Sequence, residues 1–142
     1  MREAESRTTY ERPTLFYDGD CRLCRWAVAK VMAWDRARAI RFVALQDRAE
    51  AERLLSPMDE QTRMTSWHLV TIEGRVHSAG KGVAPLLRLL PGGGPPARVA
   101  AAAQPLTDRL YDFVAARRAA FGRLVPRRAR ERADERLRRH GL

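Results

Sequence analysis

The most constraining feature of the sequence is a pair of cysteines placed where a strand gives way to a helix. Residues 14–17 (TLFY) are a short run of strand-forming residues, and residues 18–20 (DGD) end it as a turn signal. From Cys21 to about Trp34 the apolar side chains recur at helical spacing. Cys21 and Cys24 therefore stand at the start of a helix that directly follows a strand.

The segments that follow predict an α/β chain. Residues 39–45 (AIRFVAL) have the pattern of a second strand and residues 66–72 (SWHLVTI) that of a third, with which residues 75–78 would pair as a hairpin. Helical patterns lie between the strands and over residues 83–90. This βαβ unit followed by a ββα unit is the element order of a thioredoxin-like fold. A right-handed crossover would make the first two strands parallel neighbours, in a sheet with helices on both faces.

A helical annex is predicted beyond this core. Residues 91–96 (PGGGPP) interrupt the pattern and are expected to be a linker. Helices are predicted over about residues 97–103 and 106–121, and Gly122 would end the second of them as its C-terminal cap.

The length of 142 residues and the 45% hydrophobic composition fit one domain with a single core. Three parts are expected, and they are a thioredoxin-like core (13–91), an annex packed on it in the same domain (97–123), and flexible basic or polar ends (1–12 and 126–142).

The net charge of +10 is concentrated near the C-terminus, where residues 98–142 carry 12 basic and 5 acidic side chains. Such a surface could dock an acidic partner, nucleic acid or an anionic membrane. Nucleic acid is not the expected partner, because the aromatic residues typical of single-strand binders are not interleaved with the arginines. We interpret six of these arginines as a solvated face, namely Arg117, Arg118, Arg127, Arg128, Arg138 and Arg139.

The spacing of the two cysteines indicates a redox pair. Residues three apart on a helix lie on one side of it, within reach of a disulfide, and the N-terminal N–H groups stabilise a thiolate on Cys21. Neighbouring arginines would reinforce that thiolate and neighbouring aspartates would oppose it, and either aspartate could exchange a proton with Cys24. These charged residues are Asp18, Asp20, Arg22 and Arg25.

Two other interpretations of the cysteines remain open. They could be half of a zinc site completed by histidines, for which the chain offers His68, His77 and His140, but the paired ligand spacing of zinc sites is missing. His68 is expected to be a half-exposed strand residue instead. The cysteines could also be buried thiols that never react. We predict neither a metal nor a cofactor.

Residues 15–24 (LFYDGDCRLC) resemble the opening motif of the DCC family of thiol-disulfide oxidoreductases (DUF393). The resemblance continues through residues 41–46, 73–76, 80–90 and 111–118. It implies a thioredoxin-like fold in which Cys21 is the attacking thiol and Cys24 the resolving thiol. Arg22 departs from the proline that many members carry, and residues 63–66, directly before the third strand, lack the proline that thioredoxins place there. Trp26, Met64 and Thr65 are candidates for the substrate groove.

These observations predict a thiol-disulfide oxidoreductase that acts on a protein or small-molecule disulfide and is restored by an external thiol reductant. No apolar run approaches the roughly 18 residues of a membrane span, and residues 1–13 lack a secretory signal, so a cytoplasmic location is expected. The alternative is a non-enzymatic module, either a redox sensor or a basic surface that docks an acidic partner or nucleic acid.

Overall fold

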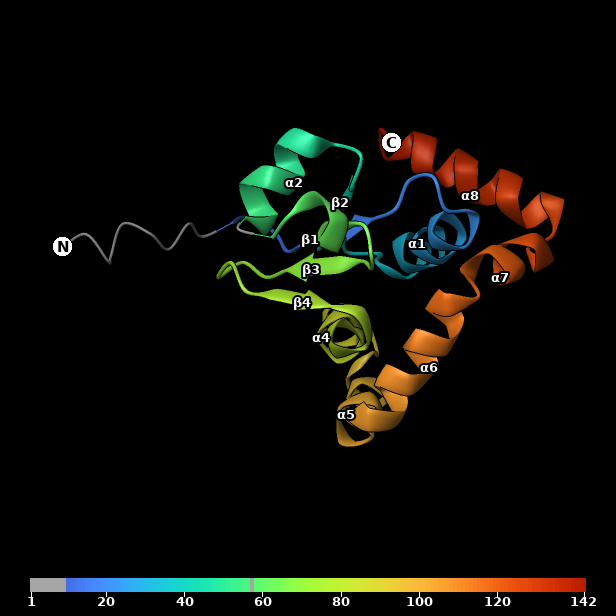
Figure 1. Ribbon diagram of the computed structural model, residues 1–142. Coiled ribbons are helices and arrows are strands. Elements are labelled where there is room, and N and C mark those ends of the chain that lie inside the picture. Colours follow the sequence, from blue (N-terminus) through green and yellow to red (C-terminus); the bar gives the residue numbers. More distant parts are fainter. Residues whose placement is uncertain (1–9, 57) are drawn as a thin grey trace.

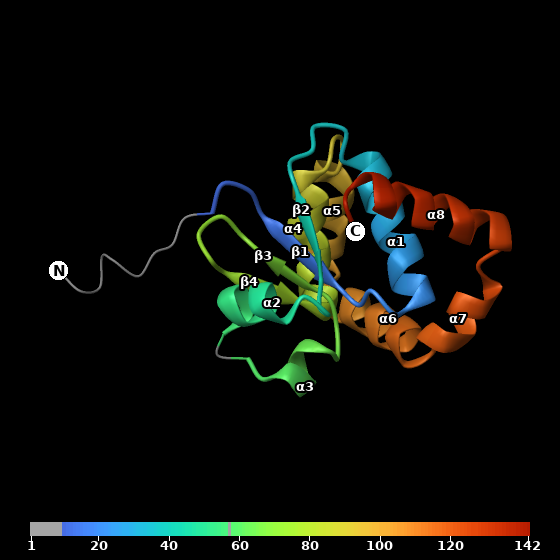
Figure 2. The same ribbon diagram turned by 90° about the horizontal axis from the view of Figure 1, so that it is seen from above.

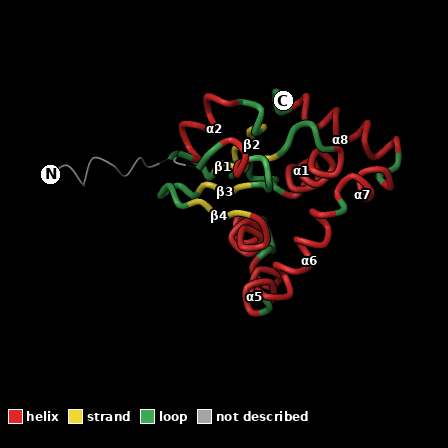
Figure 3. Tube along the Cα trace, viewed as in Figure 1, coloured by secondary structure: helices red, strands yellow, loops and turns green. Residues whose placement is uncertain are grey.

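The computed structural model describes residues 10–56 and 58–142 of the chain. The predicted flexibility of residues 1–9 lies outside the described residues. In chain order, the first elements are β1 (Thr14–Tyr17), α1 (Arg22–Trp34), β2 (Arg41–Ala44), α2 (Arg48–Leu55), α3 (Glu60–Arg63), β3 (His68–Val70) and β4 (Val76–Ser78). They are followed by the 3-10 helix η1 (Ala79–Gly82), α4 (Val83–Leu89), α5 (Gly94–Ala102), α6 (Gln104–Ala116), α7 (Arg118–Leu124) and α8 (Arg127–Arg139). Figure 3 shows that much more of the described chain is helical than strand.

The four strands form one mixed sheet in the order β2-β1-β3-β4. β1 pairs in parallel with β2, where Leu15 lies opposite Phe42, and antiparallel with β3, where Leu15 lies opposite Leu69. β3 and β4 form the predicted antiparallel hairpin, whose turn contains Gly74 at a φ of +83°. This topology confirms the thioredoxin-like fold.

All four residues of β1 are buried, because helices cover both faces of the sheet (Figure 1). Leu15 and Tyr17 point into a core shared with α1 and α4, and Phe16 points into a second core shared with α2. This alternation follows from the two-residue period of a strand. β1 is therefore held from both sides, and the turn that follows it starts from a rigid position.

Helix α8 corrects the expectation of a flexible C-terminal end. It lies alongside α1 (Figures 1 and 2), and the Leu137 side chain is 0% exposed within the core on that face of the sheet. Ala133 is also buried, and it lies four residues earlier on the same side of the helix. The ring of His140 then meets Phe42 edge to face, with 6.2 Å between the ring centroids. The buried side of α8 consists of Ala133 and Leu137. Such a narrow apolar stripe is hard to recognise in the sequence because one of its two residues is a small alanine.

The annex also differs from its predicted boundaries. Two prolines of the PGGGPP segment, Pro95 and Pro96, lie in the first turn of α5, where a missing N–H costs no hydrogen bond. The segment is therefore only partly a linker. Gly93 lies against the backbone of α4, where a Cβ atom would come within 1.8 Å of the Leu87 carbonyl oxygen. The long predicted helix is divided at Arg117 into α6 and α7, and Gly122 lies inside α7 rather than capping it.

No helix within residues 10–56 and 58–142 combines the length and the apolar character that crossing a membrane requires.

Candidate active site

Cys21 is the N-cap residue of α1. Its backbone is extended, with φ −92° and ψ 120°, and its sulfur accepts a hydrogen bond from the Cys24 N–H at 3.3 Å. That N–H is one of the free donors at the start of a helix, so the hydrogen bond stabilises negative charge on the sulfur. Both thiols are free and half-buried. The predicted strand, turn and helix therefore present a reduced C-x-x-C pair.

The Cys24 thiol is protonated at neutral pH. Burial above all, together with the hydrogen bond with Cys21 and the charges of Cys21 and Asp18, raises the pKa of Cys24 to about 12. The Arg118 guanidinium has a smaller effect in the opposite direction. The two cysteines thus differ in environment, because one caps the helix and the other is enclosed.

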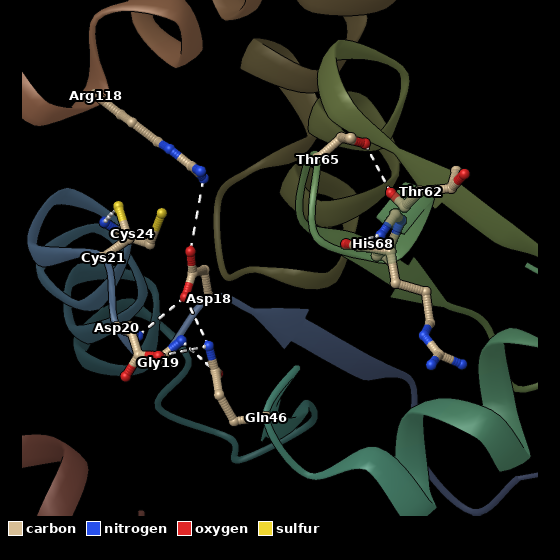
Figure 4. Close-up of polar contacts among 11 residues, drawn as sticks. Asp18, Gly19, Asp20, Cys21, Cys24, Gln46, Thr62, Thr65, His68 and Arg118 are labelled. Atoms are coloured by element: carbon tan, nitrogen blue, oxygen red, sulfur yellow. Dashed lines mark hydrogen bonds and ion pairs between the residues drawn. The ribbon is translucent and has the colours of Figure 1, made fainter. Parts of the chain in front are cut away.

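Gln46 connects the turn before the helix to the end of β2. Its amide nitrogen donates to Asp18 at 2.8 Å and to Asp20 at 3.3 Å, and its amide oxygen accepts the Gly19 N–H at 2.8 Å (Figure 4). Asp18 Oδ1 also accepts the Asp20 N–H at 2.9 Å. One side chain therefore fixes both carboxylates that precede Cys21.

Arg118 reaches the same turn from the annex. Its guanidinium lies 3.6 Å from Asp18 Oδ2 (Figure 4), and the Asp18 side chain is only 14% exposed. Arg118 is exposed, as expected of a solvated residue, but it also forms an ion pair beside the thiols that the sequence did not predict. The break between α6 and α7 places Arg118 at the first residue of α7, where it points to the thiols rather than continuing the surface of α6.

The four charged residues predicted around the thiols have different surroundings. Arg25 donates to Asp134 Oδ1 at 3.1 Å and to the Gly19 carbonyl oxygen at 3.3 Å, so it ties α1 to α8 and to the turn. Asp20 and Arg22 lie on the Cys21 side. Asp18 alone is both at the Cys24 side and among the charges that shift the pKa of Cys24.

A cavity of about 320 Å³, here called the thiol cavity, opens beside Cys24. Its lining brings together the three predicted groove residues with side chains from the loop before β3 and from α6. Among the residues that line it are Cys24, Trp26, Met64, Thr65, Trp67, Tyr111 and Val114. Burial raises the pKa of Tyr111, so its hydroxyl stays protonated. The annex therefore supplies one wall of the cavity.

A family model described as DCC1-like thiol-disulfide oxidoreductase matches residues 15–124. The chain belongs to this family. No curated protein and no solved structure gives a significant match to it. The family match begins in β1 and ends in α7, so it spans the thiol pair, Gln46 and Arg118 but leaves out α8.

The histidines considered as zinc ligands do not gather at the thiols. His68 is 1% exposed, and its ring lies against the Ser78 hydroxyl and 2.8 Å from the Arg63 carbonyl oxygen, so the expectation of a half-exposed residue is wrong. Burial lowers the pKa of His68 and keeps it neutral. Within the described part of the chain, three or more histidine, cysteine or acidic residues nowhere come together as a metal site.

Proposed function

We propose that this family member transfers electrons between its Cys21–Cys24 pair and a substrate disulfide, with Cys21 as the attacking thiol. The supporting observation is the difference between the two sulfurs. Cys21 accepts a helix N-terminal hydrogen bond, whereas the pKa of Cys24 is raised to about 12. Such an asymmetry suits a pair in which one sulfur attacks the substrate and the other reacts only in the second step.

In the reductive direction, the Cys21 thiolate attacks one sulfur of a disulfide R–S–S–R′. A bond forms between Cys21 and the RS group, and R′S⁻ leaves and is protonated by solvent. The Cys24 thiol then loses its proton and attacks Cys21 Sγ, which forms the Cys21–Cys24 disulfide and releases RS⁻. Two electrons pass from the protein to the substrate, and an external thiol reductant returns two electrons to the protein.

The mixed disulfide would itself activate Cys24. Two of the influences that raise the pKa of Cys24 come from Cys21, through its hydrogen bond and its charge. Both are lost when Cys21 Sγ becomes part of a neutral disulfide. Cys24 would therefore become a better nucleophile only after the first step, which protects the reduced pair from premature reaction.

Asp18 is the proposed acceptor of the Cys24 proton. Its carboxylate lines the thiol cavity together with Cys24, and Gln46 and Arg118 hold it in place. Asp20 lies on the other side of the turn, where it accepts from the same Gln46 amide. Of the two aspartates considered from the sequence, Asp18 is thus the better supported.

Trp26, Met64 and Thr65 would contact the substrate in the thiol cavity, whose volume lies in the range of small-molecule sites, about 300–1,000 Å³. The protein would work in a reducing compartment such as the cytoplasm, where the resting state is the dithiol.

Trapping of the mixed disulfide tests this proposal. Reduced wild type, Cys21→Ser and Cys24→Ser would each be mixed with hydroxyethyl disulfide and examined by intact mass after acid quenching. We expect a stable one-substrate adduct on Cys24→Ser, none on Cys21→Ser, and an internal disulfide on the wild type. An adduct that forms faster on Cys21→Ser than on Cys24→Ser would reverse the roles of the two thiols.

A further inference from the structure

The two thiols lie between two hollows of opposite character. The thiol cavity adjoins Cys24, and a second hollow of about 380 Å³ adjoins Cys21. This second hollow, here called the arginine hollow, is lined by Asp18, Asp20, Cys21, Arg22, Arg118, Ala119 and Arg123. Asp18 and Arg118 line both hollows, so a disulfide bound across the thiols would extend into both.

The arginine hollow is lined by three arginines and two aspartates, so its charges do not cancel. Both carboxylates accept hydrogen bonds from Gln46, and Asp18 also pairs with Arg118. Arg22 and Arg123 are exposed and make no ion pair with any other residue that the structure describes. Their guanidinium groups are therefore available to a carboxylate, which an arginine can bind through two parallel hydrogen bonds.

The thiol cavity offers a different surface. Trp26 projects from α1, Trp67 directly precedes β3, and Tyr111 closes the cavity from α6. Aromatic walls favour a flat apolar group, which can stack on them or meet them edge to face. Because α6 encloses one side, a group of about ring size would fit here better than the surface of a folded protein.

We infer that the substrate is a small disulfide that carries an apolar, ring-sized group next to sulfur and a carboxylate. This inference rests on the proposed function and names its substrate class. One half of the disulfide would enter the thiol cavity, and the other half would place its carboxylate at Arg22 and Arg123. Cys21 would then attack one of the two sulfurs that join these halves. The leaving half would depart as a thiolate, and the electron transfer would be the one already described.

Four disulfides test the preference for an aromatic group and the preference for a carboxylate independently. Dithiobis(nitrobenzoate) is aromatic and anionic, dithiodipyridine is aromatic and neutral, dithiodipropionate is aliphatic and anionic, and hydroxyethyl disulfide is aliphatic and neutral. The rate constant for oxidation of the reduced protein by each would be divided by the rate constant of dithiothreitol with the same compound, which corrects for intrinsic reactivity. We expect the corrected rate to be highest for the aromatic anion and lowest for the neutral aliphatic compound.

Variants test which hollow causes each substrate preference. Arg22→Gln and Arg123→Gln should slow both anionic compounds by up to about fivefold each relative to the neutral ones, because any effect on the Cys21 thiolate is common to all four compounds. Arg98→Gln, at an exposed position on α5, is the matched control and should change none of them. Trp26→Leu should slow the two aromatic compounds more than the two aliphatic ones. Added salt should reduce the advantage of the anions alone.

The outcomes distinguish a wrong substrate class from a wrong proposed function. Equal effects of the arginine variants on anionic and neutral compounds, or no effect on any, would overturn the carboxylate assignment. Equal effects of Trp26→Leu on aromatic and aliphatic compounds would overturn the apolar one. In either case the oxidoreductase proposal would stand as long as Cys24→Ser forms a mixed disulfide with each compound and Cys21→Ser does not. A mixed disulfide that forms faster on Cys21→Ser than on Cys24→Ser would instead contradict the proposed function itself.

Discussion

Asp18 and Arg118 stand near opposite ends of the family match, yet 3.6 Å separates the carboxylate of one from the guanidinium of the other. This ion pair joins the turn before Cys21 to the start of α7. It also places two opposite charges beside Cys24, where Asp18 raises the pKa of the thiol and Arg118 lowers it. The annex is therefore part of the site around the two thiols.

Asp18→Asn tests whether this carboxylate moves a proton. Removal of the negative charge should lower the pKa of Cys24, which by itself would speed the resolving step. Loss of the proton acceptor should instead slow it, by at least about tenfold. Rapid quenching and intact mass would follow decay of the mixed disulfide, and pH-dependent alkylation would report the thiol pKa. A lower pKa with slower resolution supports proton transfer, whereas faster resolution would leave Asp18 with an electrostatic effect only.

Gln46→Ala should destabilise the turn that carries Cys21. The variant loses hydrogen bonds to Asp18, Asp20 and the Gly19 N–H, with an expected cost of about 1–2 kcal/mol in the free energy of unfolding. Urea unfolding would measure this cost. Gln61→Ala, at an exposed position on α3, is the control and should be close to neutral. Equal stability of the two variants would show that the Gln46 contacts contribute nothing.

Leu137→Ala tests whether α8 belongs to the folded core. The side chain is fully buried against the sheet, so its truncation should cost about 2–5 kcal/mol in the free energy of unfolding. Leu124→Ala removes the same atoms from a side chain that is 74% exposed and should cost little. Chemical denaturation of both variants would decide the matter. A Leu137→Ala variant as stable as Leu124→Ala would restore the flexible tail that the sequence predicts.

The buried His68 should make stability depend on pH. Its pKa is lowered in the folded protein by burial, so protonation favours the unfolded chain. The contribution of neutral His68 is complete above the unfolded pKa of about 6.5 and is lost as the pH falls below it. Unfolding free energies measured from about pH 8 down to about pH 5 should show this loss. His68→Asn should flatten this part of the curve, and His77→Asn, at a half-exposed position, should not.

Local patterns in the sequence predicted what depends on a residue and its near neighbours. The strand, turn and helix around Cys21 follow from apolar spacing and a capping position, and the hairpin follows from Gly74 between two strands. The position of Gln46 also had a signal. β1 and β2 are parallel, so the residues that follow them meet at the same edge of the sheet, and this places Gln46 beside Asp18.

The features that sequence analysis missed depend on where helices end and how closely they pack. Arg118 lies at the thiols because the chain breaks at Arg117, and a charged pair on a helix gives no sign of such a break. Helix α8 packs through Ala133 and Leu137 among many arginines, so its apolar stripe is masked by composition. Tyr111 and Trp67 meet at the thiol cavity only through the fold.

The proposed function requires Cys21 and Cys24 to form one reversible redox couple. Its most direct measurement is a titration of the purified protein in dithiothreitol or glutathione buffers, with alkylation of free thiols and intact mass at each potential. We expect a single two-electron transition in which both thiols disappear together, and no such transition in Cys21→Ser or Cys24→Ser. Thiols that alkylate independently, or that never form the internal disulfide at any potential, would contradict it.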